Sequence, residues 1–310
     1  MLRYVLGRMT LTVPVLIGAA VLIFLLMQLV PGDAVSAVMA GGAKLSPEQQ
    51  LQMREALGLN RPLLVQLGDY LWGLVQGDLG RSTRSDRSVL SLVGAQIPST
   101  LILVAAGMTV AILIGVPLGV VAARHRNSLI DTMAMGTAVL GLSVPQFWLG
   151  LMLIFLFAVN LGWFPALSSG GFDGLVLPSV ALGVAEAAVL ARLVRSSLID
   201  ALEQDYIATA RAKGASDRRV TWRHGLRNAL VPVVTMIGLQ VGNLLGAAVV
   251  IEMLFARQGL GQLVVNSILR RDLPVLQGSI LILASIFVVI NVVVDILYKF
   301  LDPRVKLGTA

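Results

Sequence analysis

The chain has 310 residues, of which 56% are hydrophobic and 13% are charged, and its formal net charge is +7. A soluble core of this size cannot bury so much apolar surface, so the composition excludes a soluble globular domain and indicates an integral membrane protein. No basic stripe with interleaved aromatic residues accompanies the positive charge, so we expect no nucleic-acid partner. The sequence holds no cysteine and only two histidines. Disulfides and thiolate metal sites are therefore excluded, and we expect no metal site.

The first apolar segment, Leu11 to Val30, is a run of twenty uncharged residues. The two arginines before it, Arg3 and Arg8, also fit the basic start of a cleaved signal peptide. The run has the length of a full membrane span, which is longer than a typical signal-peptide core. We therefore predict that residues 1–30 form an N-terminal helix with the first transmembrane span.

Residues 31–98 are predicted to form a small extracytoplasmic loop subdomain. Ser46, Pro47 and Gln49 show the pattern of a helix that begins with a capping box. A second helix is predicted from Pro62. Its leucines form an apolar stripe that would lie on the outer membrane face: Leu63, Leu64, Leu67, Leu71 and Leu74.

The rest of the chain is predicted to be a transmembrane core over residues 99–302, followed by a cytoplasmic tail at residues 303–310. Pro145 interrupts one of its apolar segments, so we expect a broken or tilted helix there. With the first span, the predicted fold is all-α and integral to the membrane, with six transmembrane helices. The five further spans are Thr100 to Ala123, Thr132 to Val159, Gly174 to Ala191, Asn228 to Ile251 and Leu273 to Val294.

The distribution of positive charge predicts the orientation. Fifteen of the 24 lysines and arginines fall on the side that holds both termini, and six of the other nine lie in the long loop at residues 31–98. Long loops count little in the positive-inside rule. Both termini are therefore predicted to be cytoplasmic.

Glycines are spaced in two of the predicted spans so that helix backbones can approach closely. One set is Gly115 and Gly119, and the other is Gly238, Gly242 and Gly246. We interpret both sets as helix-packing positions in preference to substrate contacts.

The loop at residues 192–232 is the longest predicted cytoplasmic segment, and its centre reads as a short helix. Asp205 is predicted to cap its N-terminus, and Gly214 to end it in a left-handed conformation. Arg211 lies where a positive charge favours the C-terminal dipole. Alanines, among them Ala210, keep the helix thin enough to enter a groove of another protein, with Tyr206 and Ile207 as apolar anchors.

Several polar residues lie inside or at the ends of the apolar segments. Glu186 is the one carboxylate within its span, and intramembrane charge favours a functional role, although a structural role fits as well. Gln240, Asn243 and Asn291 are candidates for a polar substrate path, or for hydrogen bonds between helices. An extracytoplasmic gate is the candidate role for Glu252, Gly259 and Gly261.

Motifs for catalysis are absent from the sequence. It contains no G-x-x-x-x-G-K-[ST] phosphate loop and no H-E-x-x-H zinc motif. We therefore expect that the chain is not an enzyme and binds no cofactor.

The segment Ala208-Thr-Ala-Arg-Ala-Lys-Gly214, followed by Arg227-Asn-Ala-Leu-Val-Pro232, resembles the EAA loop of ABC importer permeases. Ala208 stands where that motif has its glutamate. The resemblance extends over nearly the whole chain, and it is to the dipeptide, oligopeptide and nickel permease family, in particular its B-type subunit. The other motifs that carry it are Leu29-Val-Pro-Gly-Asp33, Gly77-Asp-Leu-Gly80, Ile97-Pro-Ser-Thr-Leu101, Gly115-Val-Pro-Leu-Gly119, Ser143-Val-Pro-Gln-Phe-Trp148, Ala191-Arg-Leu-Val-Arg-Ser-Ser197, Gly259-Leu-Gly261 and Leu301-Asp-Pro-Arg304.

The resemblance implies a type I, MetI-like importer architecture in which the helix at residues 205–214 couples to an ATPase. It implies four partner subunits in the inner membrane system: a homologous second permease, two cytoplasmic ATPases that bind ATP and Mg, and an extracytoplasmic binding protein. Short peptides are the implied cargo, with nickel complexes, glutathione or other small solutes as alternatives. An ion-coupled secondary transporter is the rival class, and Glu186 is its thin support.

Overall fold

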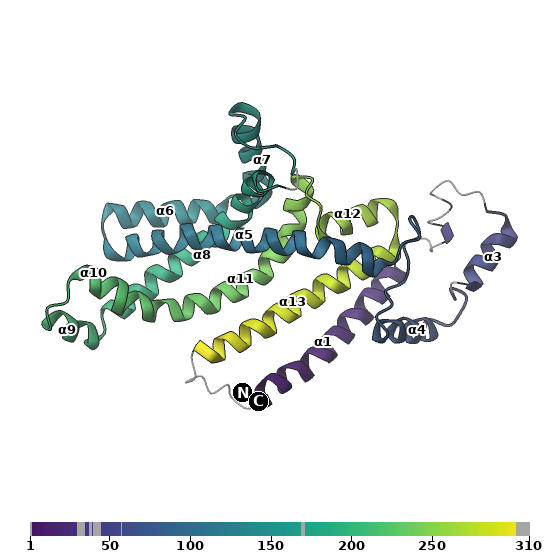
Figure 1. Cartoon of the computed structure of the whole chain (residues 1–310), viewed down its shortest axis with the longest axis horizontal. Coiled ribbons are helices and arrows are strands. Elements are labelled where there is room, and N and C mark those ends of the chain that lie inside the picture. Colours follow the sequence, from purple (N-terminus) through teal and green to yellow (C-terminus); the bar gives the residue numbers. More distant parts are fainter. Residues whose placement is uncertain are drawn as a thin grey trace. The chain divides into compact units, whose positions relative to one another are not determined.

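The structure is a computed structural model that describes residues 2–29, 35–36, 39, 45–56, 58–168 and 171–301. Within these ranges every regular element is a helix, and the only strand-like pairing is an isolated bridge between Arg81 and Ser88. The elements, shown in Figure 1, are α1 (Leu2–Gln28), α3 (Pro47–Ala56), α4 (Leu63–Val75), α5 (Val89–Arg124), α6 (Leu129–Ser143), α7 (Gln146–Leu153), η1 (Ile154–Asn160), α8 (Asp173–Leu202), α9 (Asp205–Ala212), α10 (Asp217–Arg219), η2 (Val220–Gly225), α11 (Leu226–Leu254), α12 (Leu260–Arg270) and α13 (Leu273–Leu301). The predicted tail at residues 303–310 lies outside the described residues.

The helices confirm the predicted all-α membrane fold. Five of them are long and apolar enough to cross a membrane, and α6 with α7 and η1 makes a sixth if that bent pair is one span. The pair is bent by 100° between Ser143 and Gln146. Pro145 explains the break, because it lacks an N–H and forces Val144 before it into an extended conformation. The predicted interruption at Pro145 is confirmed.

The second span begins earlier than predicted. The sequence placed its start at Thr100, after Pro98, whereas α5 begins at Val89. Val89 and Val93 are completely buried against Leu260 and Val275. Burial of these side chains offsets the loss of one helical hydrogen bond at Pro98, so the helix continues through the proline.

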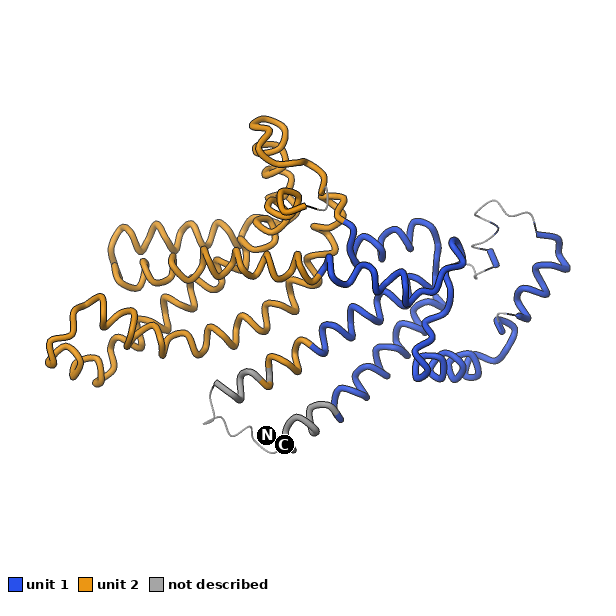
Figure 2. Tube along the Cα trace, viewed as in Figure 1, with its two compact units in different colours: residues 1–100, 258–289 blue, residues 101–257, 290–310 orange. Residues whose placement is uncertain are grey.

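The chain divides into two compact units, coloured blue and orange in Figure 2. Unit 1 comprises residues 1–100 and 258–289, and unit 2 comprises residues 101–257 and 290–310. In unit 1, α1 and α13 pack through a cluster of Ala20, Ile23 and Leu281. The rings of Phe24 and Tyr70 stack beside it with their centroids 5.6 Å apart.

The two loop helices of unit 1 follow the local signals of the sequence. At the start of α3 the Ser46 N–H donates to Gln49 Oε1 (2.9 Å), and the Gln49 N–H donates to Ser46 Oγ (3.3 Å), so the predicted capping box is confirmed. In α4, Leu71 and Leu74 pack against the α1–α13 cluster, whereas Leu64 is 80% exposed. The leucine stripe is therefore divided between the protein and its surroundings.

In unit 2, α8 packs against α6, α7 and α11. A Cβ atom added to Gly115 would lie 2.5 Å from the Ala187 carbonyl oxygen, and one added to Gly119 would lie 2.5 Å from the Ala191 carbonyl oxygen. Such distances show that α5 and α8 are in backbone contact. The predicted packing role of this glycine pair is confirmed.

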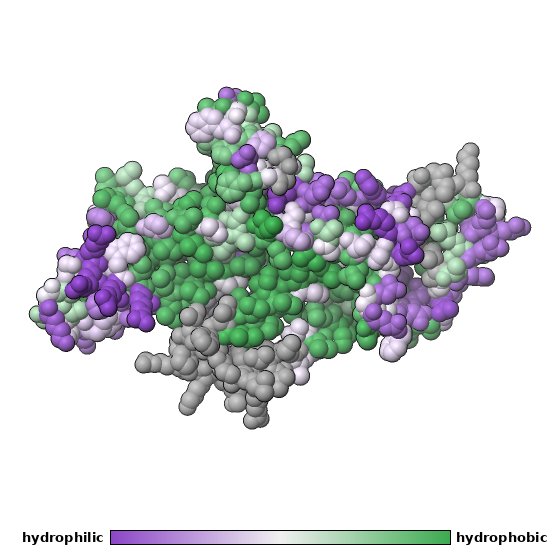
Figure 3. Space-filling view, viewed as in Figure 1, coloured by the Kyte–Doolittle hydropathy of each residue, from purple (hydrophilic) through white to green (hydrophobic). Residues whose placement is uncertain are grey.

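The surface of unit 2 is apolar over its helix bodies and hydrophilic where α9 and α10 lie, as Figure 3 shows. Exposed apolar side chains include Leu113, Leu140, Leu239 and Val250. A wide apolar surface bounded by a polar end is what a bilayer requires of a protein that spans it.

Candidate functional site

The short helix α9 projects between the end of α8 and the start of η2. It spans eight residues, which is about 12 Å at 1.5 Å per residue. Gly214 follows it with φ +80° and its N–H donates to the Arg211 carbonyl oxygen, so the predicted left-handed end of the helix is confirmed.

The N-terminus of α9 differs from the prediction. Gln204 occupies the capping position in an extended conformation, and Asp205 is the first helical residue, with no side-chain cap hydrogen bond from Gln204. The Ile207 N–H donates to the Gln204 carbonyl oxygen, which moves the helix start by one residue. Asp205 still places a negative charge in the first turn, where it favours the helix dipole.

The two predicted apolar anchors of α9 point in different directions. Ile207 is only 1% exposed and is packed within its own chain, so it is not available as an anchor for another protein. Tyr206 is 40% exposed. The prediction for Ile207 was wrong because α9 buries this side chain, the one buried residue of the helix, against its own protein.

Tyr206 connects α9 to the segment that leads into the membrane. Asn228 Nδ2 donates to the Tyr206 hydroxyl at 2.8 Å, and that hydroxyl donates to the His224 carbonyl oxygen at 3.4 Å. Asn228 lies at the start of α11, and His224 lies in η2. Sequence reasoning missed this link, for which Asn228, within the second half of the EAA-like motif, was the only available signal.

The outward surface of α9 is formed by small and basic residues. Ala208, Thr209, Arg211 and Ala212 are exposed, and Ala210 is half-buried. Arg211 Nε lies 3.8 Å from Asp217 Oδ1 in a pair whose side chains are 54% and 85% exposed. Such an exposed pair contributes little to stability.

Of the four residues predicted for a substrate path, the structure brings two together. Gln240 is 2% exposed and Glu186 is 9% exposed, and Gln240 Nε2 donates to the Glu186 carbonyl oxygen at 3.4 Å. Asn243 lies on an exposed face of α11, and Asn291 is half-buried on α13. Glu186 and Gln240 therefore join α8 to α11 inside unit 2, while Asn243 faces outward.

The predicted gate residues are buried. Glu252 is 0% exposed near the end of α11, and its carbonyl oxygen accepts the Arg257 N–H at 2.8 Å. Burial lowers the pKa of the Arg257 guanidinium, and the nearby Glu252 carboxylate raises it in part. Arg257 Nη1 also contacts Ser168 Oγ at 3.2 Å. Glu252 therefore belongs to a buried polar cluster at the end of α11 and not to the surface.

Gly259 and Gly261 belong to unit 1, at the start of α12. Both are buried, and the Leu260 N–H between them donates to Thr100 Oγ1 at 2.8 Å. Gly259 is extended, with φ −175°, a conformation open to any residue. The hydrogen bond shows that this segment holds α12 to α5 within unit 1.

Comparison with known protein families identifies the family of this chain. The family described as the binding-protein-dependent transport system inner membrane component matches residues 115–307. Its N-terminal counterpart matches residues 1–104. The chain belongs to this permease family. It is thus a multi-pass inner-membrane permease subunit of a binding-protein-dependent ABC importer, a class that works with ATPase and binding-protein partners.

Relatives of this permease match along its full length. A protein of Brucella abortus (strain 2308), whose name describes a peptide transport system permease, is 45% identical over 99% of both chains. The glutathione transport system permease GsiC of Salmonella typhimurium is 43% identical over 99% of both chains. The dipeptide transport system permease DppB of Alkalihalophilus pseudofirmus is 40% identical over 99% of this chain and all of its own.

Solved structures share the permease fold. Two crystal forms of the inward-facing MetNI methionine ABC transporter match with TM-scores of 0.59 and 0.60 at 20% identity, over 69% of this chain and 97% of theirs. An amino acid ABC transporter solved with histidines matches with a TM-score of 0.52 at 16% identity, over 69% and 94%. At this level of identity the likeness concerns the fold alone, and it confirms the expected importer permease architecture.

Within the permease, a two-point ion pair between α6 and α8 was missed by sequence reasoning. Arg195 on α8 holds Asp131 on α6 through two contacts of 2.6 Å. The available signal was that Asp131 is the last charge before a long uncharged stretch. The pair ties α6 to α8 in the half of α8 that leads to α9.

Proposed function

We propose that this permease carries short peptides across the cytoplasmic membrane, together with a homologous second permease. The observation that carries the proposal is full-length similarity at 40–45% identity to permeases named for peptides, dipeptides and glutathione. Glutathione is itself a short peptide, so all three names share one class of cargo. Glutathione is the second candidate cargo, on the strength of its 43% identical relative.

We propose that α9 is the coupling helix that an ATPase subunit contacts. Support comes from its projection between α8 and α11, its small exposed side chains and its tether through Tyr206. With Ala208 in place of a glutamate and Ile207 buried, the contact depends on shape, on Tyr206 and on Arg211. Closure of the ATPases would pull α9 and, through Asn228, the start of α11, which gives a rigid-body form of alternating access.

In this proposal the loop at residues 192–232 and both termini are cytoplasmic, and residues 31–98 are extracytoplasmic. The charge distribution supports this orientation, because basic residues concentrate on the side of α9. ATP and Mg bind only to the two partner ATPases. This chain supplies no catalytic residue and binds no cofactor of its own.

We further propose that the substrate path lies between the two permeases. The exposed face of α11 supports this placement, because it combines apolar side chains with a polar side chain and a small residue. Asn243 is the member of the predicted set that lies on this face, which also carries Leu239, Gly246 and Val250. Gln240 and Glu186, which are buried in unit 2, would not line the path but would pack behind the helix face that lines it.

Reconstitution tests the function. Proteoliposomes with both permeases, the ATPases and the binding protein should accumulate a radiolabelled dipeptide when ATP is present, and unlabelled dipeptide should compete. Nickel and glutathione serve as the alternative cargoes in the same assay. Accumulation by this chain alone, driven by a proton or sodium gradient, would instead identify a secondary transporter.

A further inference from the structure

A small pocket lies in unit 1, and its lining combines polar and charged side chains with the apolar Leu92, Leu263 and Val275. Its volume is about 190 Å³. The loop between α4 and α5 forms one wall, and the end of α12 with the turn into α13 forms the other. The residues that matter for its chemistry are Arg84, Ser85, Arg87, Asn266, Arg270 and Asp272.

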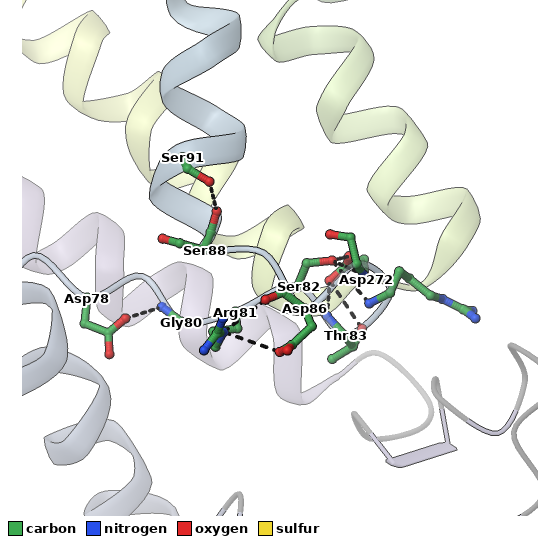
Figure 4. A network of polar contacts seen from close by, with 11 residues as sticks. Asp78, Gly80, Arg81, Ser82, Thr83, Asp86, Ser88, Ser91 and Asp272 are labelled. Carbon is green, nitrogen blue, oxygen red and sulfur yellow. Dashed lines mark hydrogen bonds and ion pairs between the residues drawn. The ribbon is translucent and has the colours of Figure 1, made fainter.

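Asp272 joins the two walls of the pocket. It is 5% exposed, and its Oδ2 accepts a hydrogen bond from the Ser82 hydroxyl at 2.5 Å. Its Oδ1 accepts from the Thr83 N–H at 3.1 Å and from the Thr83 hydroxyl at 3.3 Å. Figure 4 shows this carboxylate turned toward Ser82 and Thr83. The negative charge of Asp272 is therefore used within the protein, where it positions the loop.

The loop places Arg84 at the pocket. Ser82 Oγ accepts hydrogen bonds from the N–H groups of Arg84 (3.2 Å) and Ser85 (3.0 Å). Arg84 Nε then donates to the Arg270 carbonyl oxygen at 2.8 Å, across the pocket's two walls. A guanidinium has five N–H donors, so this anchor leaves the Nη groups of Arg84 for a ligand.

The pocket carries an excess of positive charge. Three arginines line it, against the one carboxylate of Asp272. The neighbouring Asp86 is 3.3 Å from Arg81 and pairs with it outside the lining. In the part of the chain that the structure describes, Arg87 and Arg270 make no ion pair. Like charges that line one pocket repel one another, and a bound anion would offset that repulsion.

Both walls contain a residue in the left-handed conformation. Asp86 has φ 53°, and Arg271 has φ 54°. Residues other than glycine adopt this conformation rarely, and they keep it where surrounding contacts hold them. Contacts therefore fix the backbone of the loop and of the turn that carry the pocket's arginines.

We propose that this pocket binds a single carboxylate group presented at the extracytoplasmic face. A guanidinium fork matches a carboxylate in shape and charge, and Asn266 adds an amide donor. Sites for whole small molecules occupy roughly 300–1,000 Å³, so a pocket of about 190 Å³ suits one group and not an entire peptide. The assignment to that face rests on the proposed function, in which residues 31–98, and with them the loop that carries Arg84 and Arg87, are extracytoplasmic.

Direct binding tests the pocket without any transport. The full chain in nanodiscs of zwitterionic lipid is titrated with ¹³C-acetate, and bound acetate is followed by NMR. The double variant Arg87→Gln/Arg270→Gln should weaken acetate binding by about tenfold for each arginine removed. Arg271→Gln is the matched control, since it removes an adjacent exposed charge that does not line the pocket, and it should bind acetate as the unmodified chain does.

Equal acetate binding in the double variant and the unmodified chain would overturn the proposal, as would an equal loss in Arg271→Gln. Both replaced side chains are exposed, so unchanged thermal midpoints are expected and confirm that the variants are folded. Because this measurement needs no cargo, it can succeed even where peptide transport by the reconstituted system fails.

Two further measurements distinguish the source of the carboxylate. If the carboxylate belongs to an acidic side chain of the binding protein, the double variant lowers the affinity of that protein for the assembled transporter about tenfold or more. Replacing that acidic residue of the binding protein by lysine then restores its binding to the Arg87→Glu permease. If it belongs to the peptide, the double variant removes the difference in KM between a dipeptide and its C-terminal amide. Acetate binding with neither effect would mark an adventitious ion only and would overturn the proposal.

Discussion

Asp131 and Arg195 form a two-point ion pair between α6 and α8, with both nitrogen–oxygen distances at 2.6 Å. The Asp131 side chain is 6% exposed and that of Arg195 is 27% exposed. The Asn127 N–H also donates to Asp131 Oδ2 at 3.0 Å. Arg195 lies about two turns before the end of α8 that leads into α9. The pair therefore stiffens the helices that would carry motion between α9 and the membrane core.

Asp131→Asn should lower the stability of the permease by about 1–3 kcal/mol, because it leaves the Arg195 guanidinium without its carboxylate partner. The thermal unfolding midpoint of the purified chain in detergent is the measurement. Arg126→Gln is the matched control, since it breaks an ion pair with Glu203 whose side chains are 50% and 61% exposed. That change should cost about 0–1 kcal/mol. Equal midpoints for the two variants would show that the buried pair does not join the helices.

Tyr206→Phe should reduce the transport obtained per ATP hydrolysed, while the amount of inserted permease stays the same. The phenyl ring keeps its packing, but the bond from Asn228 Nδ2 is lost. Asn228→Ala should have the same effect, and the double variant should be no worse than either single one, because both remove one interaction. The check is the ratio of dipeptide uptake to phosphate release in proteoliposomes. Additive losses would mean that the two residues act separately.

Gly214→Pro should uncouple ATP hydrolysis from uptake without preventing membrane insertion. The residue has φ +80°, whereas proline requires a φ near −65°, so the end of α9 must be rebuilt. A bulky residue at the half-buried Ala210 should have a similar effect by lifting α9 from its own protein. Ala208→Ser is the control, because Ala208 is exposed. Normal uptake in both Gly214→Pro and Ala210→Leu would contradict the role of α9 in coupling.

Gly183→Ala should destabilise the contact between α5 and α8 by about 1–3 kcal/mol. Its new Cβ would lie 2.4 Å from the Gly107 carbonyl oxygen, so one helix backbone must move. Gly136→Ala on α6 is the control, since an added Cβ there meets nothing within 4 Å. Thermal unfolding and gel-filtration profiles of the two variants provide the comparison. A Gly183→Ala variant as stable as Gly136→Ala would show that α5 and α8 can separate freely.

Glu186→Gln should leave dipeptide uptake unchanged. The residue is 9% exposed inside unit 2, and its carbonyl oxygen, which accepts from Gln240, is unaffected by the substitution. Gln240→Leu removes the side chain that joins α8 to α11, so it should lower the thermal midpoint. Loss of uptake in Glu186→Gln at normal stability would instead assign a transport role to the carboxylate.

The sequence by itself determined the membrane class, the positions of most spans and the family. It also predicted the break at Pro145, the capping box at Ser46 and the left-handed end of α9 at Gly214. These features depend on local chemistry: a span needs about twenty apolar residues, proline lacks an N–H, and glycine tolerates positive φ. The ordered motifs of the family needed no knowledge of tertiary contacts.

Only the tertiary structure decided which residues face one another. It placed Ile207 inside and Tyr206 outside, separated Asn243 from Gln240, and joined Asp131 to a residue 64 positions away. In a membrane protein both lipid and protein neighbours are apolar, so hydrophobic periodicity does not reveal which face of a helix packs against protein. Pairing between distant segments depends on how the helices assemble. The assembly also brings Asp272 to Ser82 and forms the pocket lined by Arg84, Arg87 and Arg270.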